Sequence, residues 1–263
     1  MPDALVLAGG RPDPALPQGV PNKAFLALCG RPMVEFVLQA LRAATSIRRI
    51  ALVGPDPLPG SVAAHADLTI GERGGLLDNV AAGLAGVGGG TPVLAVAADI
   101  PLLASGTVDA FVKAASALGA ELVYGVVRRE DIRHELPGAR KTFVRLREGT
   151  FTGGSLILLD PRAFAHARAA IDRAVRARKR PWELARMFGL RTLLGLLTGT
   201  LEIAELERRA SLLTGVRARA LICRTPDIAL DVDTPEMLAA VGARLAERLG
   251  AAAPLPTDSV ADS

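Results

Sequence analysis

The stretch Ala4-Leu5-Val6-Leu7-Ala8-Gly9-Gly10 places an apolar run directly before two adjacent glycines. A short, wholly apolar run that ends in glycines is typical of a strand covered on both faces of a parallel sheet. Paired glycines after such a strand leave backbone N–H groups open to an anion. Lys23, at the far end of the same loop, adds a movable positive charge suited to phosphate. The alternative interpretation is a plain strand-to-helix turn followed by a surface lysine.

The alternation of apolar strands and amphipathic helices continues through the first 130 residues. Strands are predicted at residues 4–7, 50–53, 67–70, 92–97 and 122–127, and helices at 33–44, 76–85 and 107–118. This order predicts a three-layer α/β fold with a mostly parallel sheet. The patterns GxGxxG and GxxxxGK[ST] are absent, which disfavours a dinucleotide-binding dehydrogenase and a P-loop NTPase.

The pattern changes after residue 130. Residues 142–146 and 155–159 are predicted as strands around a glycine-rich turn, 161–214 as a helical insertion, and 218–223 and 228–232 as short strands. Thr234 is a natural N-cap for a closing helix that ends at Leu249, with Pro235 at its first position. We expect one domain over residues 1–250 and a flexible C-terminal tail over 251–263.

Composition excludes several classes of protein. The chain has 263 residues, of which 50% are hydrophobic and 22% charged, and this is too apolar for a disordered chain. The two cysteines, Cys29 and Cys223, lack CxxC spacing, so a disulfide scaffold or a cysteine zinc site is disfavoured. Nine scattered aromatic residues do not make a stacking platform for nucleic acid. No apolar run is long enough for a membrane span and no basic leader opens the chain, so we expect a cytoplasmic protein.

Asp99 follows the predicted strand at residues 92–97. An acid at the end of a buried strand is costly unless a partner offsets its charge. Mg²⁺ takes one or two carboxylates together with phosphate oxygens of a substrate, so Asp99 is a candidate metal ligand. The alternative, that Asp99 caps the next helix, is weaker because Ser105 is better placed as that N-cap.

Three further segments are candidates for binding. Asp231 lies on the predicted strand at 228–232 and Asp233 directly after it, two residues further on the same face, so we expect Asp233 to face a shared site and Asp231 to lie deeper; a polar strand exit is the alternative. The segment Thr152-Gly153-Gly154 is favoured as a hairpin turn, and alternatively forms a wall where a substrate lies close to the backbone. The loop that holds Gly75 and Asn79 precedes a helix. Because Glu72 and Asp78 disfavour a phosphate there, we assign it to the base or ribose of a nucleotide.

The helical insertion contains a basic cluster before an apolar stretch. Arg173, Arg176, Arg178, Lys179 and Arg180 precede Trp182 and the apolar residues 188–197. Such a helix can lie on a membrane surface, but we favour packing on its own domain or on a second subunit in a homodimer.

Taken together, these motifs resemble the start of nucleotidyltransferases with a GT-A type fold, and most of all the MobA-like NTP transferase domain. The matching segments are residues 5–10, Asn22-Lys23, Leu28-Cys29-Gly30-Arg31-Pro32-Met33, Asp99-Ile100-Pro101 and Asp231-Val232-Asp233-Thr234-Pro235-Glu236. The resemblance covers residues 1–130 and about 218–249. The loop between Gly10 and Lys23 departs from the family's Gly-Gly-x-Ser-x-Arg-x-Gly pattern.

The resemblance implies transfer of a nucleoside monophosphate from CTP or GTP to a phosphorylated small molecule, with release of pyrophosphate. Lys23 would steady the triphosphate, and Asp99 would hold Mg²⁺ with Asp233, or less favourably Asp231, as the second ligand. The nucleotide-binding residues would be Leu7, Ala8, Gly9, Gly10, Lys23, Gly75 and Asn79. The acceptor-binding residues would be Thr152, Gly153 and Gly154.

Two other function classes stay open. A GT-A glycosyltransferase would consume a nucleotide sugar, but such enzymes usually place Asp-x-Asp where this chain has Asp99-Ile100-Pro101. A non-catalytic nucleotide-binding module is the other class, and the joint presence of Lys23, Asp99 and Asp233 argues against it.

Overall fold

The computed structural model describes the chain except for residues 11–15, 89, 178–188 and 251–263. The predicted C-terminal tail at 251–263 lies outside the described residues, as do Trp182 and the last three residues of the basic cluster, Arg178, Lys179 and Arg180.

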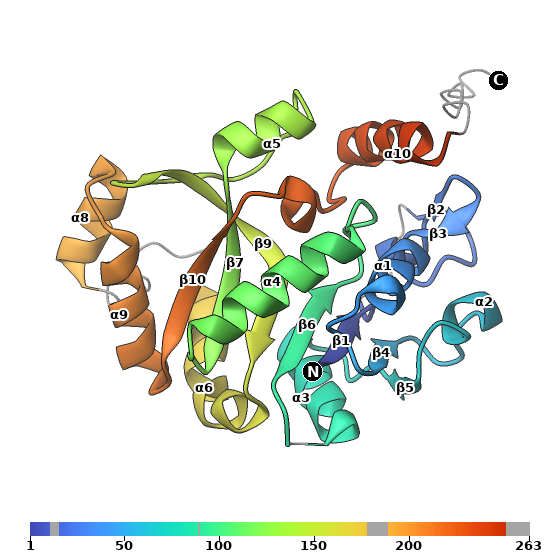
Figure 1. The fold of residues 1–263 in the computed structure, drawn as a ribbon, viewed down its shortest axis with the longest axis horizontal. Coiled ribbons are helices and arrows are strands. Elements are labelled where there is room, and N and C mark those ends of the chain that lie inside the picture. The colour runs from blue at the N-terminus through green and yellow to red at the C-terminus, as the bar shows by residue number, and fades with distance from the viewer. Residues whose placement is uncertain (11–15, 89, 178–188, 251–263) are drawn as a thin grey trace.

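A mostly parallel, twisted sheet forms the centre of the molecule, as the sequence predicts (Figure 1). Its strand order is β10-β7-β9-β6-β1-β4-β5, and β8 pairs with β9 alone. Strand β9 is antiparallel to both of its neighbours, β6 and β7. The strands are β1 (Asp3–Leu7), β4 (Ile50–Gly54), β5 (Leu68–Gly71), β6 (Val93–Ala97), β7 (Leu122–Arg128), β8 (Val144–Leu146), β9 (Gly149–Leu159) and β10 (Ala218–Cys223), with a separate hairpin of β2 (Ala27–Leu28) and β3 (Arg31–Pro32).

Helices cover both faces of the sheet, which explains why residues 4–7, 50–53 and 93–97 of β1, β4 and β6 are all apolar. Val6 of β1 packs in one cluster with Leu38 of α1, whereas its neighbour Leu5 packs in another with Leu84 of α3 and Phe164 of α6. Successive side chains of a strand point to opposite faces, so both must be apolar here. The helices are α1 (Met33–Ala43), α2 (Gly60–Ala63), α3 (Leu76–Val87), α4 (Ser105–Ala117), α5 (Arg129–Glu135), α6 (Pro161–Ala177), α8 (Leu190–Thr198), α9 (Ile203–Thr214) and α10 (Pro235–Leu249), with 3-10 turns η1 (Lys23–Phe25) and η2 (Pro226–Ala229).

Helix α9, the last helix of the predicted insertion, packs beside β10. In α9, the Glu207 carboxylate accepts a hydrogen bond of 2.8 Å from the Ala220 N–H, and the Ser211 hydroxyl accepts one of 3.0 Å from the Ala218 N–H. Helix α9 therefore covers the outer edge of β10. This packing supports the proposal that residues 161–214 belong to the same domain as the sheet. No helix among the described residues has the length and apolar character needed to cross a bilayer.

The structure corrects the prediction of a glycine-rich turn at residues 152–155. These residues lie inside β9, and the turn between β8 and β9 falls at Arg147 and Glu148. A Cβ at Gly153 would overlap the hydroxyl of Tyr124 on the neighbouring strand. The glycine is therefore needed for close approach between two strands rather than for a reversal of the chain.

The predicted strand at residues 228–232 is also wrong. Residues 226–229 form η2, and the chain then runs as a loop to Thr234. Ile228 and Leu230 are fully buried in the cluster on the α1 and α4 side of the sheet, so packing rather than strand pairing accounts for their apolar character. The predicted closing helix is confirmed as α10: Thr234 accepts a hydrogen bond from the Met237 N–H, and Pro235 occupies the first turn.

Candidate active site

The predicted site residues from three strands lie at one edge of the sheet. Strands β1 and β6 are parallel neighbours, with Leu7 beside Ala97, so Gly9 and Asp99 follow their carboxyl ends together. On β9, Thr152 and Gly153 pair with the last residues of β7, at the same edge, and Gly154 follows them. Ligands of open α/β sheets bind at this edge.

Asn22, buried beside Lys23, fixes the approach of the lysine to the sheet. Its side-chain oxygen caps η1 by accepting a hydrogen bond of 3.0 Å from the Ala24 N–H, and its amide donates one of 2.8 Å to the carbonyl oxygen of Ala8. These two bonds tie the start of η1 to the end of β1. The Lys23 ammonium then lies 2.6 Å from the carboxylate of Asp99 and also contacts that of Asp233.

The charged groups of this cluster shift one another's pKa values. Burial works against the charged form of Lys23, but Asp99 and Asp233 outweigh it and raise the pKa of the lysine above its usual value. The interaction with Asp231, and then the contact with the Lys23 ammonium, lower the pKa of Asp233. Burial, and then the Asp233 carboxylate, raise the pKa of Asp231. At neutral pH Lys23 is therefore a cation held between two carboxylates.

Asp99 has a free coordination position. One of its oxygens contacts Lys23, while the other, Oδ1, is buried without a hydrogen-bond partner among the described residues. The backbone N–H of Val232 donates a 2.9 Å hydrogen bond to the Asp99 carbonyl, and this brings the Asp231–Asp233 loop alongside although it is not a strand. Carboxylate oxygens are hard ligands, so an unpaired one beside a second carboxylate fits a magnesium ion.

The predicted nucleotide-binding residues also lie together. The Gly10 N–H donates a 2.8 Å hydrogen bond to Glu72, and a Cβ at Gly9 would lie 2.5 Å from the side-chain nitrogen of Asn79. Asn79 is buried and accepts a 2.6 Å hydrogen bond from the Arg73 N–H, while Gly75 is the N-cap residue of α3. Gly9 and Gly10 thus lie against the loop after β5 and the start of α3.

Lys141 is a site residue that the sequence interpretation missed. It forms an ion pair with Asp231 in which the side chains are only 9% and 18% exposed. A signal was present, because the chain has only four lysines and two of them, Lys23 and Lys141, lie in this cluster. Asp231 and Asp233 therefore have different partners, Lys141 and Lys23 respectively.

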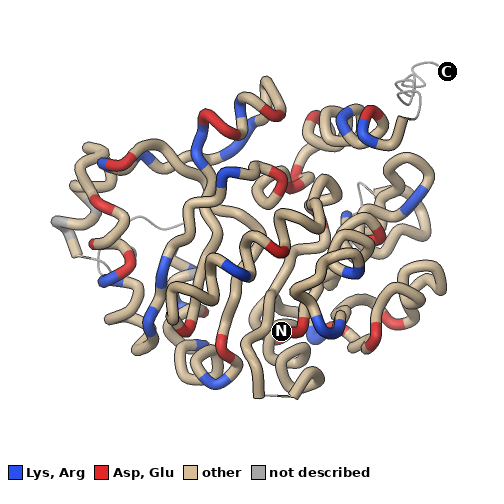
Figure 2. The backbone as a smooth tube through the Cα atoms, in the orientation of Figure 1, with Lys and Arg blue, Asp and Glu red and all other residues tan. Residues whose placement is uncertain are grey.

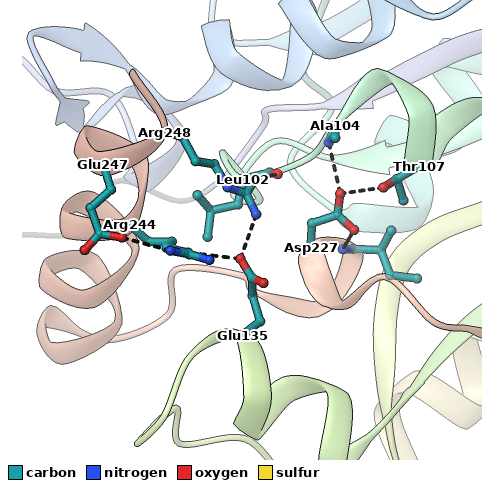
Figure 3. A network of polar contacts seen from close by, with 9 residues as sticks. Leu102, Ala104, Thr107, Glu135, Asp227, Arg244, Glu247 and Arg248 are labelled. Carbon is teal, nitrogen blue, oxygen red and sulfur yellow. Dashed lines mark hydrogen bonds and ion pairs between the residues drawn. The ribbon is translucent and has the colours of Figure 1, made fainter. Parts of the chain in front are cut away.

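A polar network beneath the site corrects the prediction that Ser105 caps α4. The N-cap residue is Ala104, whose side chain cannot cap. The Asp227 carboxylate takes the place of a capping side chain. It accepts hydrogen bonds of 3.0 Å from the Ala104 N–H and 2.7 Å from the Thr107 hydroxyl (Figure 3). The loop that carries Asp231 and Asp233 is thus anchored on α4.

The second half of this network ties α10 to α5 (Figure 3). Glu135 accepts hydrogen bonds of 3.1 Å from Arg244 and 2.8 Å from Arg248, and Arg248 also donates one of 2.7 Å to the carbonyl of Leu102. These bonds therefore join three segments that neighbour site residues: Leu102 follows Asp99, Glu135 precedes Lys141, and α10 follows Asp233.

Comparison with known proteins places the chain in a family. The profile of the MobA-like NTP transferase domain matches residues 4–180. A structure described as a hypothetical transferase from Thermus thermophilus is 45% identical, with a TM-score of 0.82, over 90% of this chain and 99% of that one. No curated protein matches the chain at a significant level.

Two more distant structures share the fold. One is CMP:2-keto-3-deoxy-manno-octonic acid synthetase complexed with CTP, with 13% identity and a TM-score of 0.57 over 94% of this chain and 99% of that one. The other is 2-C-methyl-D-erythritol 4-phosphate cytidylyltransferase from Thermus thermophilus, with 16% identity and a TM-score of 0.53 over 95% and 99%. With the profile match over most of its sheet, the chain belongs to the MobA-like NTP transferase domain family of nucleotidyltransferases.

Proposed function

We propose that this protein is a Mg²⁺-dependent nucleotidyltransferase that transfers a nucleoside monophosphate from CTP or GTP to a phosphorylated small molecule and releases pyrophosphate. The observation that carries the proposal is Lys23, held between Asp99 and Asp233 at the carboxyl edge of the sheet. Membership of the nucleotidyltransferase family supports the reaction type.

The nucleotide would bind on the β1 side of the site. The Gly9–Gly10 backbone would face its phosphates, and the Gly10 N–H would exchange Glu72 for a nucleotide oxygen. Its base or ribose would lie toward Gly75 and Asn79. Since one of the fold relatives is named as a complex with CTP, CTP is the first nucleotide to test.

Asp99 and Asp233 would hold the magnesium ion, with Asp231 kept by Lys141. Three carboxylates and two ammonium groups leave the cluster with one net negative charge, which by itself repels a triphosphate. A bound Mg²⁺ would supply the missing positive charge and polarise the phosphate oxygens. Lys23 would then be free to turn from the carboxylates toward the triphosphate.

The proposed reaction joins the acceptor phosphate to the α-phosphorus of the NTP. A phosphate oxygen of the acceptor attacks this phosphorus, and the bond from the α-phosphorus to the bridging oxygen breaks. The electron pair of that bond leaves with pyrophosphate. Because the attacking oxygen is already ionised, no general base is required, and the chain's task is positioning and charge stabilisation by Lys23.

Release of pyrophosphate tests this function. The full chain is incubated with Mg²⁺, each of the four common NTPs in turn, and a panel of phosphorylated sugars and alcohols. The proposal expects pyrophosphate from one NTP in the presence of an acceptor, and loss of the signal in Lys23→Met. Release of a nucleoside diphosphate from a nucleotide sugar would indicate a glycosyltransferase instead, and binding without turnover a regulatory module.

A further inference from the structure

Lys141 and Asp231 form an ion pair that is largely buried, with side chains only 9% and 18% exposed. Lysine is rarely buried in this way, and the desolvation of two charges offsets much of their mutual attraction. Such a pair contributes little to stability by itself. Its position next to the candidate active site points instead to a role in binding.

The pair lies on the side of the site away from the nucleotide-binding loop. Lys141 comes from the segment that leads into β8, whose first residue, Val144, pairs with Phe151 of β9. The next residue of β9, Thr152, begins the predicted acceptor wall. Lys23 and Lys141 therefore approach the Asp231–Asp233 loop from the β1 side and the β9 side respectively.

Tyr124 and Arg129 belong to segments that contact those of Asp231 and Lys141: Tyr124 interacts with Asp231, and Arg129 with Phe143, two residues after Lys141. The Tyr124 hydroxyl lies against Gly153, and burial, followed by the Asp231 carboxylate, raises the pKa of this tyrosine, so it stays a hydrogen-bond donor. The guanidinium of Arg129 lies 4.7 Å from the ring centre of Phe143, and its buried Nε has no hydrogen-bond partner among the described residues.

The surrounding segment is positively charged. Residues 128–147 contain seven lysines and arginines against three acids. Figure 2 marks these charged positions on and around α5. The segment therefore adds to the attraction of an anion toward this side of the site.

We propose that Lys141 binds the phosphate of the acceptor, and that Asp231 holds the lysine in place until the acceptor arrives. This inference rests on the proposed function and divides the site between two cations. Lys23 serves the nucleotide, whereas Lys141, assisted by the Tyr124 hydroxyl, serves the acceptor. The ion pair with Asp231 offsets part of the desolvation of the Lys141 ammonium when no acceptor is bound.

Phosphate binding to the nucleotide complex tests the inference. The full chain is saturated with Mg²⁺ and an α,β-methylene analogue of CTP or GTP, and inorganic phosphate is titrated in by calorimetry. In Lys141→Met we expect phosphate to bind roughly tenfold or more weakly, while the analogue keeps its affinity within about threefold. Lys113→Met, which removes an exposed lysine of α4, is the matched control and should bind both as the wild type does.

Two further variants keep the test decisive. Lys141→Met leaves Asp231 without its partner, so the double variant with Asp231→Asn removes both charges and protects folding. It should show the same loss of phosphate binding. Asp231→Asn alone frees the ammonium and should strengthen phosphate binding several-fold, whereas a purely structural pair would make this variant bind phosphate more weakly or not at all.

The outcomes separate this inference from the proposed function. Wild-type phosphate affinity in the double variant, no phosphate binding to the wild-type nucleotide complex, or weaker binding in Asp231→Asn would each overturn the role of Lys141 and leave nucleotide transfer standing. Failure of the analogue itself to bind the wild type would overturn the proposed function. Acetate serves as a second probe: weaker binding than phosphate supports a phosphate acceptor, and equal or tighter binding contradicts it.

Discussion

The Asp227 carboxylate accepts a 2.7 Å hydrogen bond from the hydroxyl of Thr107, which lies 120 residues earlier in the chain. Together with its bond to the Ala104 N–H, this contact caps α4 and anchors the loop that follows β10.

Asp227→Ala should lower the free energy of unfolding by about 1–3 kcal/mol, because it leaves the start of α4 without its acceptor. Urea titration followed by circular dichroism measures the change. Ser105→Ala is the matched control and should change stability by less than about 0.5 kcal/mol. A larger loss of stability in Ser105→Ala than in Asp227→Ala would indicate that Ser105 caps α4.

Asp99→Asn should reduce pyrophosphate release by roughly 10²–10³-fold, because the site loses a ligand that anchors positive charge at the reacting phosphate. Thermal stability should fall little. Nucleotide binding should weaken in the presence of Mg²⁺ and change little in its absence. Asp172→Asn, on α6, provides the control. Near-normal turnover of both Asp99→Asn and Asp233→Asn would contradict the proposed metal ligands.

Gly9→Val should block nucleotide binding while the sheet stays folded. A Cβ at this position would lie 2.5 Å from Asn79 and 2.7 Å from Glu72, so even the first side-chain carbon displaces the neighbouring loop. Calorimetric titration of the NTP should show a loss of at least about tenfold, a drop of ~1.4 kcal/mol or more. Gly106→Ala, where a Cβ meets no atom of the described residues, is expected to bind normally. Unchanged affinity in folded Gly9→Val would argue against nucleotide binding at this loop.

Asp3 should make the protein sensitive to acid. Burial opposes ionisation of this carboxyl, but hydrogen bonds from Arg48 and Arg49 outweigh burial and lower its pKa. The ion pairs therefore stabilise the fold above the ordinary aspartate pKa of about 3.9, and this contribution is lost as the pH falls through the lowered value.

Asp3→Asn tests this pH dependence. The variant should be about 1–3 kcal/mol less stable at pH 7, with a smaller difference from the wild type near pH 2. Urea titrations at the two pH values give the comparison. A difference that does not depend on pH would exclude the ion pairs as its source.

The parts of the fold that the sequence predicted well are those governed by local pattern. β1, β4 and β6 are apolar because both faces are covered, and the Thr234-Pro235 start of α10 is a local signal. The strand proposed at 228–232 failed because burial of Ile228 and Leu230 gives an apolar run without any pairing. The pattern reports burial, and burial alone does not distinguish a strand from a packed loop.

In the candidate site, too, residues in local motifs could be predicted from the sequence, whereas contacts between distant residues could not. Gly9, Lys23, Asp99 and Asp233 stand in recognisable motifs, and the structure brings them to one edge of the sheet. The Lys141–Asp231 pair joins residues 90 positions apart and the cap from Asp227 joins residues more than 100 apart. Neither has a local pattern, because the partners meet only once the sheet has formed.

The hydrogen bonds from β10 to Glu207 and Ser211 also bear on aggregation. An uncovered outer strand offers its N–H groups to any other extended chain, and sheets then grow from molecule to molecule. With the Ala218 and Ala220 N–H groups already engaged by α9, this side of the sheet is closed to such growth. Helix α9 thus protects these two positions of β10 from pairing with another extended chain, whereas β5 lies at the opposite end of the sheet.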